Sequence, residues 1–300
     1  RLAQGRADDL LATLCLASDR PLFVAPAMNQ QMWNNKATQD NLALLKKRGV
    51  KLLGPGAGDQ ACGDVGPGRM LEPKEIRDLV AAHFSSGPLS GVKVVVTAAP
   101  TREPLDPVRV LTNRSSGKMG FAVAQALAGL GAQVTLIAGP VNLPTPGGVK
   151  RSDVETAEDM LKASLASARG AQIFVGVAAV ADYRPRTVSR EKIKKKTAAL
   201  SLPMERTRDI LAAVRSKFPK LFMVGFAAET GKLEENARAK LKNKKLDLVA
   251  ANLVGRGRAF DRDDNELHVY WQNGGVALGK ASKTDLARRL GDLINQRYKR

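Results

Sequence analysis

The sequence predicts an α/β protein of two domains, the larger of which is built around a mostly parallel sheet. Continuous apolar runs such as 92-VKVVVTA-98 and 133-QVTLIAG-139 alternate with amphipathic segments of helical period. Such runs are typical of parallel strands that are buried on both faces. The length of 300 residues suits two domains, and the turn-rich stretch 84-FSSGPLSG-91 interrupts the alternation. We therefore predict a first domain at 1–83, a linker at 84–91 and a second domain at 92–300.

The first domain is predicted to alternate between strands and helices. The expected elements are a strand at 22–25, a helix at 31–48, a strand at 50–54 and a helix from Pro73 to about His83. Between the second strand and the last helix lies 54-GPGAGDQACGDVGPGRM-70, which contains six glycines and two prolines. We expect this glycine-rich stretch to be a loop, because glycine and proline interrupt regular structure.

The two cysteines of the chain differ in their surroundings. Two cysteines in 300 residues exclude a disulfide framework and favour a reducing, cytoplasmic location. Cys15 is interpreted as a small, buried apolar residue. Cys62 lies in the glycine-rich stretch between Ala61 and Gly63, where a buried structural thiol is not expected.

The second domain continues the alternation over a longer stretch. We expect strands at 92–98, 133–139, 172–178, 221–227 and 246–252, and helices near 117–130, 157–168, 208–217 and 233–244. Residues 266-ELHVYWQNGGVALG-279 predict a hairpin with an Asn-Gly turn. Ser282 with Asp285 predicts the start of the last helix. The expected sheet is parallel and covered by helices on both faces.

The charge of the chain is strongly positive, with 48 Lys and Arg against 29 Asp and Glu and a net charge of +19. Such a field attracts polyanions. The basic clusters 184-RPRTVSREKIKKK-196 and 238-RAKLKNKK-245 are either solvated faces or sites for small phosphorylated ligands. An aromatic content of 4% without basic–aromatic interleaving or zinc-finger spacing argues against nucleic acid as the partner. No run approaches 18 apolar residues, so we expect no membrane partner.

The long stretch 99-APTREPLDPVRVLTNRSSGKMG-120 follows the first strand of the second domain. Ligands of open α/β sheets bind beyond the carboxyl ends of strands, and a helix that begins near Gly117 offers free N–H groups to an anion. A Walker A loop is excluded because Thr112 and Met119 occupy required positions, and the G-x-G-x-x-G pattern is absent. The stretch is therefore either an anion site of another kind or an ordinary connecting loop.

Polar and aromatic residues also follow other strands. Asp182 comes after the strand at 172–178, and Phe226 ends the strand at 221–227. Each has an ordinary interpretation as a helix cap or a core aromatic residue. Together with the lysines that follow Glu191, they indicate a candidate site at one edge of the sheet. In the first domain, Asn29 of PAMN follows a strand and is either a carboxylate-binding residue or part of a turn.

Seven stretches occur here in one order: PAMNQQMWNN, QACGDVGPGRMLEP, TREPLDPVR, SSGKMGFA, AAVADYRP, EKIKKK and GFAAET. They resemble the bifunctional coenzyme A biosynthesis family, in which phosphopantothenoylcysteine decarboxylase is fused to phosphopantothenate–cysteine ligase. The resemblance extends over essentially all 300 residues. It implies a Rossmann-like ligase domain preceded by part of a flavodoxin-like flavoprotein domain. It also implies the cofactors FMN and Mg²⁺, CTP as co-substrate, and a homo-oligomer.

In the first domain, the resemblance implies that Asn29 holds the carboxylate of the substrate and that Cys62 donates a proton from a mobile loop. Neither His83 nor His268 lies in a matching motif. The chain begins after the part of the decarboxylase that is expected to hold its catalytic histidine. We therefore expect most of the FMN site to lie outside this chain.

In the second domain, the resemblance implies that CTP activates 4′-phosphopantothenate as an acyl-cytidylate and that cysteine then displaces CMP. Asn113 matches the residue that handles the acyl-cytidylate, and Lys192 is expected to be catalytic. The cytidine site matches Gly176, Val177, Ala178, Asp182 and Phe226, and the triphosphate contacts match Lys192, Lys240 and Lys244. The residues that ligate the metal ion are not assigned.

Two positions depart from the family pattern. Ala99 stands where a glycine is usual, and alanine adopts a positive φ only at a cost. Thr207-Arg208 stands where the family usually has Asn-Pro, directly before Asp209, which is a further candidate ligand of the nucleotide. The alternative from another class is an α/β module that binds nucleotides or nucleic acid without catalysis.

Overall fold

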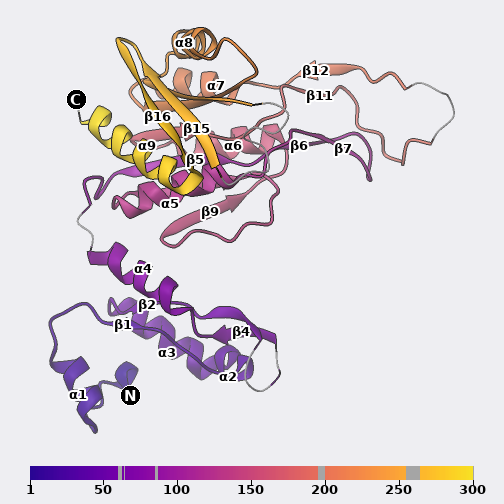
Figure 1. Cartoon of the computed structure of the whole chain (residues 1–300). Coiled ribbons are helices and arrows are strands. Elements are labelled where there is room, and N and C mark those ends of the chain that lie inside the picture. The colour runs from indigo at the N-terminus through magenta and orange to yellow at the C-terminus, as the bar shows by residue number, and fades with distance from the viewer. Residues whose placement is uncertain (60–62, 64, 85–86, 195–199, 255–263, 300) are drawn as a thin grey trace. The chain divides into compact units, whose positions relative to one another are not determined.

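The computed structural model describes residues 1–59, 63, 65–84, 87–194, 200–254 and 264–299. The chain divides into two compact units, Arg1–Phe84 and Ser85–Arg300, each of which is described by itself (Figure 1). Within these ranges, no helix combines the length and the apolar character needed to cross a membrane.

Unit 1 is a small α/β unit. Its elements are a 3₁₀ helix (Leu2–Gln4), α1 (Leu10–Ala17), β1 (Phe23–Val24), α2 (Gln30–Asn34), α3 (Lys36–Lys47), β2 (Lys51–Leu52), β3 (Gly56–Asp59), β4 (Val65–Arg69) and α4 (Pro73–Phe84). Strands β1 and β2 lie within the two predicted strand positions and pair in parallel, with Phe23 opposite Lys51. Strands β3 and β4 pair antiparallel within the glycine-rich stretch. The prediction of a loop there is wrong because glycine and proline conceal the strand pattern.

The single helix predicted at 31–48 is instead two helices, α2 and α3. Asn35 ends α2 and caps α3, where its side-chain oxygen accepts a hydrogen bond from the Ala37 N–H at 3.0 Å. Asparagine is a strong N-cap because its side chain competes for backbone groups. The break therefore follows from a single residue that the hydrophobic pattern does not reveal.

Unit 2 contains a sheet of eight described strands in the order β16-β15-β14-β13-β10-β5-β8-β9. The strands are β5 (Lys93–Ala98), β8 (Gln133–Ala138), β9 (Val149–Asp153), β10 (Ile173–Gly176), β13 (Phe222–Glu229), β14 (Leu248–Leu253), β15 (Asp264–Trp271) and β16 (Gly274–Ser282). Strands β14 to β9 are parallel, and β15 and β16 add an antiparallel hairpin. The mostly parallel α/β sheet predicted from the apolar runs is confirmed.

Helices cover both faces of this sheet. They are α5 (Lys118–Gly129), α6 (Ala157–Ser167), α7 (Ile210–Lys217), α8 (Leu233–Asn243) and α9 (Lys283–Tyr298). The core consists of two apolar clusters, one with α5 and α9 and the other with α6, α7 and α8. Successive residues of β5 alternate between them: Val94 and Val96 pack in the first cluster and Val95 in the second. Burial on both faces explains the unbroken apolar run.

Three short pieces of unit 2 were not predicted. Edge strand β9 has the sequence VKRSD and therefore lacks an apolar run. The hairpins β6–β7 (Arg102–Pro104 and Val110–Thr112) and β11–β12 (Tyr183–Pro185 and Met204–Arg206) stand apart from the large sheet, and in Figure 1 β11 and β12 run side by side away from it. Strands of three residues give too little periodicity for a prediction.

Two further predictions concern the turn after β15 and the start of α9. The turn predicted at Asn273-Gly274 is wrong by one residue, because Gly274 pairs with Trp271 across the hairpin. A Cβ atom at Gly274 would lie 2.8 Å from Nε1 of Trp271, so the glycine makes room for the indole ring. Helix α9 begins as predicted, with the Asp285 N–H donating to Oγ of Ser282 at 3.1 Å.

Candidate active site

A pocket of about 520 Å³ opens where β10 and β13 end, which is the edge of a parallel sheet at which ligands bind. Seven of the residues proposed for nucleotide binding line it: Gly176, Ala178, Asp182, Asp209, Phe226, Lys240 and Lys244. The fold therefore brings together residues that are up to 68 positions apart in the sequence, from Gly176 to Lys244.

Gly176 shapes the wall of the pocket. It lies opposite Gly225 in the register of β10 and β13. A Cβ atom at Gly176 would lie 2.7 Å from Cδ2 of Leu211, so a side chain there would force the Leu211 side chain to move. The absence of a side chain therefore leaves room for Leu211 of α7, and both residues line the pocket.

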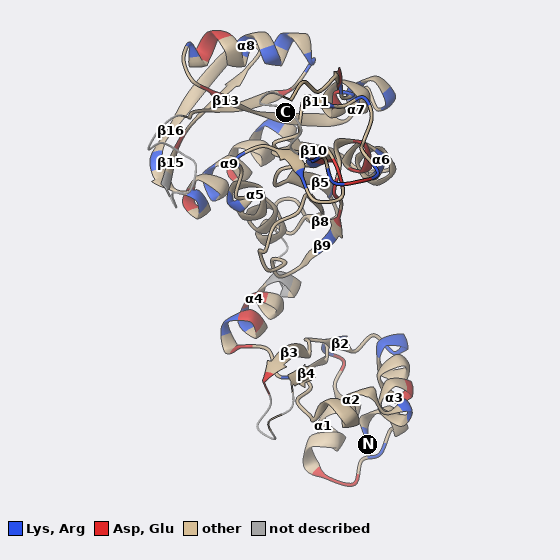
Figure 2. Ribbon diagram, turned by 90° about the vertical axis from the view of Figure 1, so that its right-hand side faces the viewer, with Lys and Arg blue, Asp and Glu red and all other residues tan. Residues whose placement is uncertain are grey.

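The last turn of α8 supplies two cations. Lys240 and Lys244 are four residues apart and therefore lie on one face of the helix, and Figure 2 shows the gathering of basic residues along α8. Nζ of Lys240 donates to the carbonyl oxygen of Phe226 at 2.6 Å, and Nζ of Lys244 pairs with Asp209 at 2.7 Å. Burial lowers the pKa of the Lys240 ammonium, although Asp209 and Glu229 oppose the shift.

Asp209 contacts both the N-terminus of α7 and Lys244 of the cationic face. Its side chain caps α7 by accepting from the Ala212 N–H at 2.8 Å. Burial raises the pKa of Asp209, but the hydrogen bonds from Lys244 and Ala212 outweigh burial and hold the pKa below its ordinary value. The carboxylate is therefore charged at neutral pH and fixed in place.

The segment before Asp209 forms a wall of the pocket that sequence reasoning missed. Tyr183, Arg206, Thr207 and Arg208 all line the pocket. Thr207 anchors this segment, because its N–H donates to the Asp182 carbonyl at 3.0 Å and its hydroxyl to the Ala181 carbonyl at 2.6 Å. The pairing of β11 with β12 brings these residues beside Asp182, and neither strand is long enough to be read from the sequence.

Asn113 and Val177 lie next to the pocket but do not line it. Nδ2 of Asn113 donates to the carbonyl oxygens of Ala179 and Val180, at 3.0 and 3.1 Å. These bonds place Asn113 against the chain that follows β10. The N–H of Val177 donates to the Thr97 carbonyl at 3.1 Å, so Val177 extends the pairing of β10 with β5.

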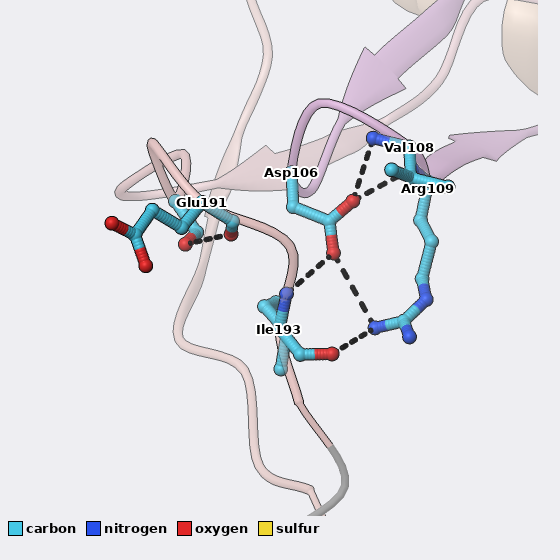
Figure 3. Close-up of polar contacts among 6 residues, drawn as sticks. Asp106, Val108, Arg109, Glu191 and Ile193 are labelled. Carbon is cyan, nitrogen blue, oxygen red and sulfur yellow. Dashed lines mark hydrogen bonds and ion pairs between the residues drawn. The ribbon is translucent and has the colours of Figure 1, made fainter.

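Lys192 is exposed and does not line the pocket. Its neighbour Ile193 is held at the β6–β7 hairpin by Asp106, whose side chain is buried (Figure 3). The carboxylate accepts from the N–H groups of Ile193, Val108 and Arg109 at 3.1, 2.8 and 2.8 Å. Burial raises the pKa of Asp106, but these three hydrogen bonds and the Arg109 charge outweigh it and lower the pKa.

Ala99 adopts the positive φ that its side chain disfavours, with a value of 70°. Its carbonyl accepts from the Ala179 N–H at 3.0 Å, and a Cβ atom at Gly117 would lie 3.1 Å from its methyl group. The turn after β5 thus contains a left-handed residue that is not glycine. The left-handed conformation costs about 1–2 kcal/mol for a residue with a side chain.

In unit 1, Asn29 caps α2, with its side-chain oxygen accepting from the Gln31 N–H at 2.7 Å. The Met28 N–H donates to the Gly68 carbonyl at 2.9 Å, which ties the PAMN turn to β4. Asn29 therefore lies next to a strand of the glycine-rich stretch. Cys62 lies outside the described residues, and Cys15 is half-buried.

The two units match two known protein families. Residues 89–298 match the DNA/pantothenate metabolism flavoprotein C-terminal domain, and residues 1–85 match the Flavoprotein family. The chain is 50% identical to Coenzyme A biosynthesis bifunctional protein CoaBC of Haemophilus influenzae, over 100% of this chain and 76% of that protein. It is 51% identical to CoaBC of Escherichia coli K12 (99% and 75%) and 44% identical to CoaBC of Bacillus subtilis (91% and 69%).

Solved structures agree with these matches. The crystal structure of the C-terminal domain of CoaBC superimposes with a TM-score of 0.61 at 37% identity, over 70% of this chain and 97% of that domain. A DNA/pantothenate metabolism flavoprotein from Streptococcus pneumoniae has the same fold, with a TM-score of 0.60 at 22% identity, over 69% of this chain and 99% of that chain.

The fold and the pocket define an α/β protein with a cationic ligand site at the carboxyl ends of its parallel strands. The chain belongs to the family of bifunctional coenzyme A biosynthesis proteins, in which phosphopantothenoylcysteine decarboxylase is fused to phosphopantothenate–cysteine ligase.

Proposed function

We propose that unit 2 ligates 4′-phosphopantothenate to cysteine with CTP as co-substrate. The observation that carries this proposal is the pocket at the ends of β10 and β13. Among the described residues it has four cationic side chains, Arg206, Arg208, Lys240 and Lys244, and two carboxylates, Asp182 and Asp209. Its volume of about 520 Å³ is in the range of nucleotide-sized ligands.

The reaction has two steps. The carboxylate of 4′-phosphopantothenate attacks the α-phosphorus of CTP, so that a C–O–P bond forms, the α–β phosphoanhydride bond breaks and pyrophosphate leaves. The amine of cysteine then attacks the acyl carbon, an amide forms, and CMP leaves while the amine loses a proton. Lys240 and Lys244 stabilise the charge that moves onto the pyrophosphate, and Asn113 is proposed to position the acyl-cytidylate.

The remaining assignments concern how the nucleotide is held. Phe226 and Ala178 line the space assigned to cytidine, and Gly176 and Val177 shape the strand end beside it. Lys192 is proposed to act on the phosphates as well, from the segment that Asp106 anchors. Because Lys192 does not line the pocket in this structure, this role requires its side chain to move toward the pocket.

Mg²⁺ fits this pocket only as a companion of the phosphates. No group of three His, Cys, Asp or Glu side chains among the described residues could hold a metal ion alone. The Asp209 carboxylate is engaged by Lys244, whereas the Asp182 carboxylate makes no hydrogen bond or ion pair with the residues described. Because Mg²⁺ is commonly held by one or two carboxylates together with substrate phosphates, Asp182 is the residue that would contact it.

For unit 1 we propose a part in the decarboxylation of phosphopantothenoylcysteine. The match to the Flavoprotein family supports a flavin, and FMN, when bound, would supply reversible two-electron redox chemistry. Asn29 would hold the substrate carboxylate and Cys62 would return a proton to the product. In a protein that also contains the rest of the flavin site, replacement of Cys62 by Ser should then abolish product formation in the decarboxylase assay and leave the ligase step unchanged.

We propose small-molecule partners only, a homo-oligomeric state and a cytoplasmic location, for which the sparing use of cysteine is the support. The test of the ligase is pyrophosphate release by the purified chain with CTP, 4′-phosphopantothenate and cysteine. Sustained release should require all three compounds, and CTP should be preferred over ATP by at least about tenfold in kcat/KM. A chain that binds CTP but releases no pyrophosphate under any combination would instead be a nucleotide-binding module.

A further inference from the structure

Three of the four cations in the pocket of unit 2 are already engaged by protein acceptors. Lys240 donates to the Phe226 carbonyl, and Lys244 pairs with Asp209. Nε of Arg206 lies 3.5 Å from the hydroxyl of Tyr183. Arg208 differs from them, because neither its guanidinium nor its backbone N–H has a partner within the described parts of the chain.

The backbone on both sides of Arg208 is fixed. Thr207 makes two hydrogen bonds to the carbonyls of Ala181 and Asp182. Asp209 caps α7 and pairs with Lys244. Arg208 is therefore held at the wall of the pocket by its neighbours, and its side chain is exposed and unengaged. A ligand can bind this guanidinium without first breaking a contact within the protein.

The resemblance of the sequence implies an Asn-Pro pair where this chain has Thr207-Arg208. Proline has neither a charge nor an N–H group. Relative to proline, Arg208 adds a second guanidinium beside that of Arg206, and a backbone N–H donor, to this wall of the pocket. A guanidinium presents a planar set of donors that matches two phosphate oxygens at once.

We propose that Arg208 is an additional phosphate-binding residue of this chain, which holds the terminal phosphates of the nucleoside triphosphate. This inference rests on the proposed function of unit 2. Since the ligand contact is with phosphate, the contribution of Arg208 grows with the number of phosphates and is absent for the monophosphate. The other phosphate that could meet this guanidinium is that of 4′-phosphopantothenate, and the experiment separates the two.

The test is calorimetric titration of the full chain with CTP, CDP and CMP. Replacement of Arg208 by Gln should raise the Kd for CTP about tenfold, which is the scale of one charge-assisted hydrogen bond, and change the Kd for CMP by less than about twofold. Arg208→Pro, which removes the guanidinium and the backbone N–H together, should weaken CTP binding at least as much as Arg208→Gln. The matched control is Arg169→Gln, an exposed arginine shortly before β10 and thus at the opposite end of that strand from the pocket, which should leave all three Kd values unchanged.

The outcomes distinguish this inference from the function on which it rests. If the wild-type chain does not bind CTP, both the proposed nucleotide site and the role of Arg208 are overturned. If the wild type binds CTP and Arg208→Gln binds it equally tightly, only the role of Arg208 is overturned. An increase in the KM for 4′-phosphopantothenate with an unchanged Kd for CTP also overturns it, because the guanidinium would then serve the other phosphate.

Discussion

The two units of the chain differ in how much apolar surface they bury. Among the described residues of unit 1, the buried apolar side chains are those of Ala3, Ala12, Pro26, Leu42 and Leu53. Helix α1 exposes its leucines, with Leu10 at 76% and Leu11 at 71%. Every large side chain that is fully buried in the described chain belongs to unit 2.

This difference bears on function because a site is only as well positioned as the elements that carry it. In unit 2, the pocket residues extend from strand ends and from helices that pack on a two-sided core. In unit 1, Asn29 precedes a helix of only five residues, and the described sheets have two strands each. We therefore expect substitutions in unit 2 to affect geometry and stability more strongly than equivalent substitutions in unit 1.

The largest expected effect is on stability. Leu248 of β14 is fully buried, with 0% exposure, whereas Leu14 of α1 is 58% exposed. Leu248→Ala should lower the free energy of unfolding of unit 2 by about 2–5 kcal/mol, because it leaves a cavity in the core. Leu14→Ala, the same chemical change, should alter stability by less than about 0.5 kcal/mol. Denaturant titration, combined with hydrogen exchange in each unit, measures both changes in stability. Equal losses in the two variants would contradict the inferred difference between the units.

The next effect is on the ligase. Lys240→Ala should lower kcat/KM by roughly 10²-fold, the scale for loss of one charge-stabilising group in a site. Lys242 lies two residues away on α8, is exposed and does not line the pocket, so Lys242→Ala is the control and should keep full activity. Steady-state ligase assays of both variants measure the change in kcat/KM. Full activity of Lys240→Ala would show that the Lys240 side chain of α8 does not contribute to the reaction.

A smaller effect is expected where Asp106 anchors Ile193. Asp106→Asn should speed hydrogen exchange of the Ile193 N–H by about tenfold, because a charged acceptor is replaced by a neutral one. Since the folded pKa of Asp106 lies below its ordinary value of 3.8, the anchor is fully present above that pH. It should be lost as the pH falls through the lower, folded value. Unchanged exchange in the variant would show that the carboxylate does not hold the segment.

The smallest effect concerns the strained turn after β5. Ala99→Gly should stabilise unit 2 by about 0.5–1 kcal/mol, because relief of the left-handed strain exceeds the extra entropy that glycine gives the unfolded chain. Thermal unfolding of the wild type and the variant measures this difference. A destabilised variant would show that the methyl packing against Gly117 outweighs the strain.

How much of this structure the sequence predicts depends on burial. Strands β5, β8, β10, β13 and β14 are predicted within a few residues, because their apolar runs reflect burial on both faces. Strand β9 and the hairpins β3–β4, β6–β7 and β11–β12 are missed. They are short, polar or rich in glycine, and their pairing depends on tertiary contacts that leave no periodic signal.

The candidate site shows the same division. Asp182 follows one predicted strand and Phe226 lies near the end of another, so their edge of the sheet could be predicted from the residues alone. Lys240 and Lys244 enter the pocket through the packing of α8, and the sequence gives only a basic cluster there. Arg206 and Arg208 reach the pocket through the β11–β12 pairing, which no local pattern predicts.

The most direct test of the central claim, that the pocket of unit 2 is the CTP site, is hydrogen exchange of the full chain with and without CTP. We expect slower exchange in the segments 176–182, 206–211 and 226–244, which contain most of the pocket residues, and unchanged exchange throughout unit 1. Protection confined to unit 1, or unchanged exchange of all three segments at saturating CTP, would contradict the claim.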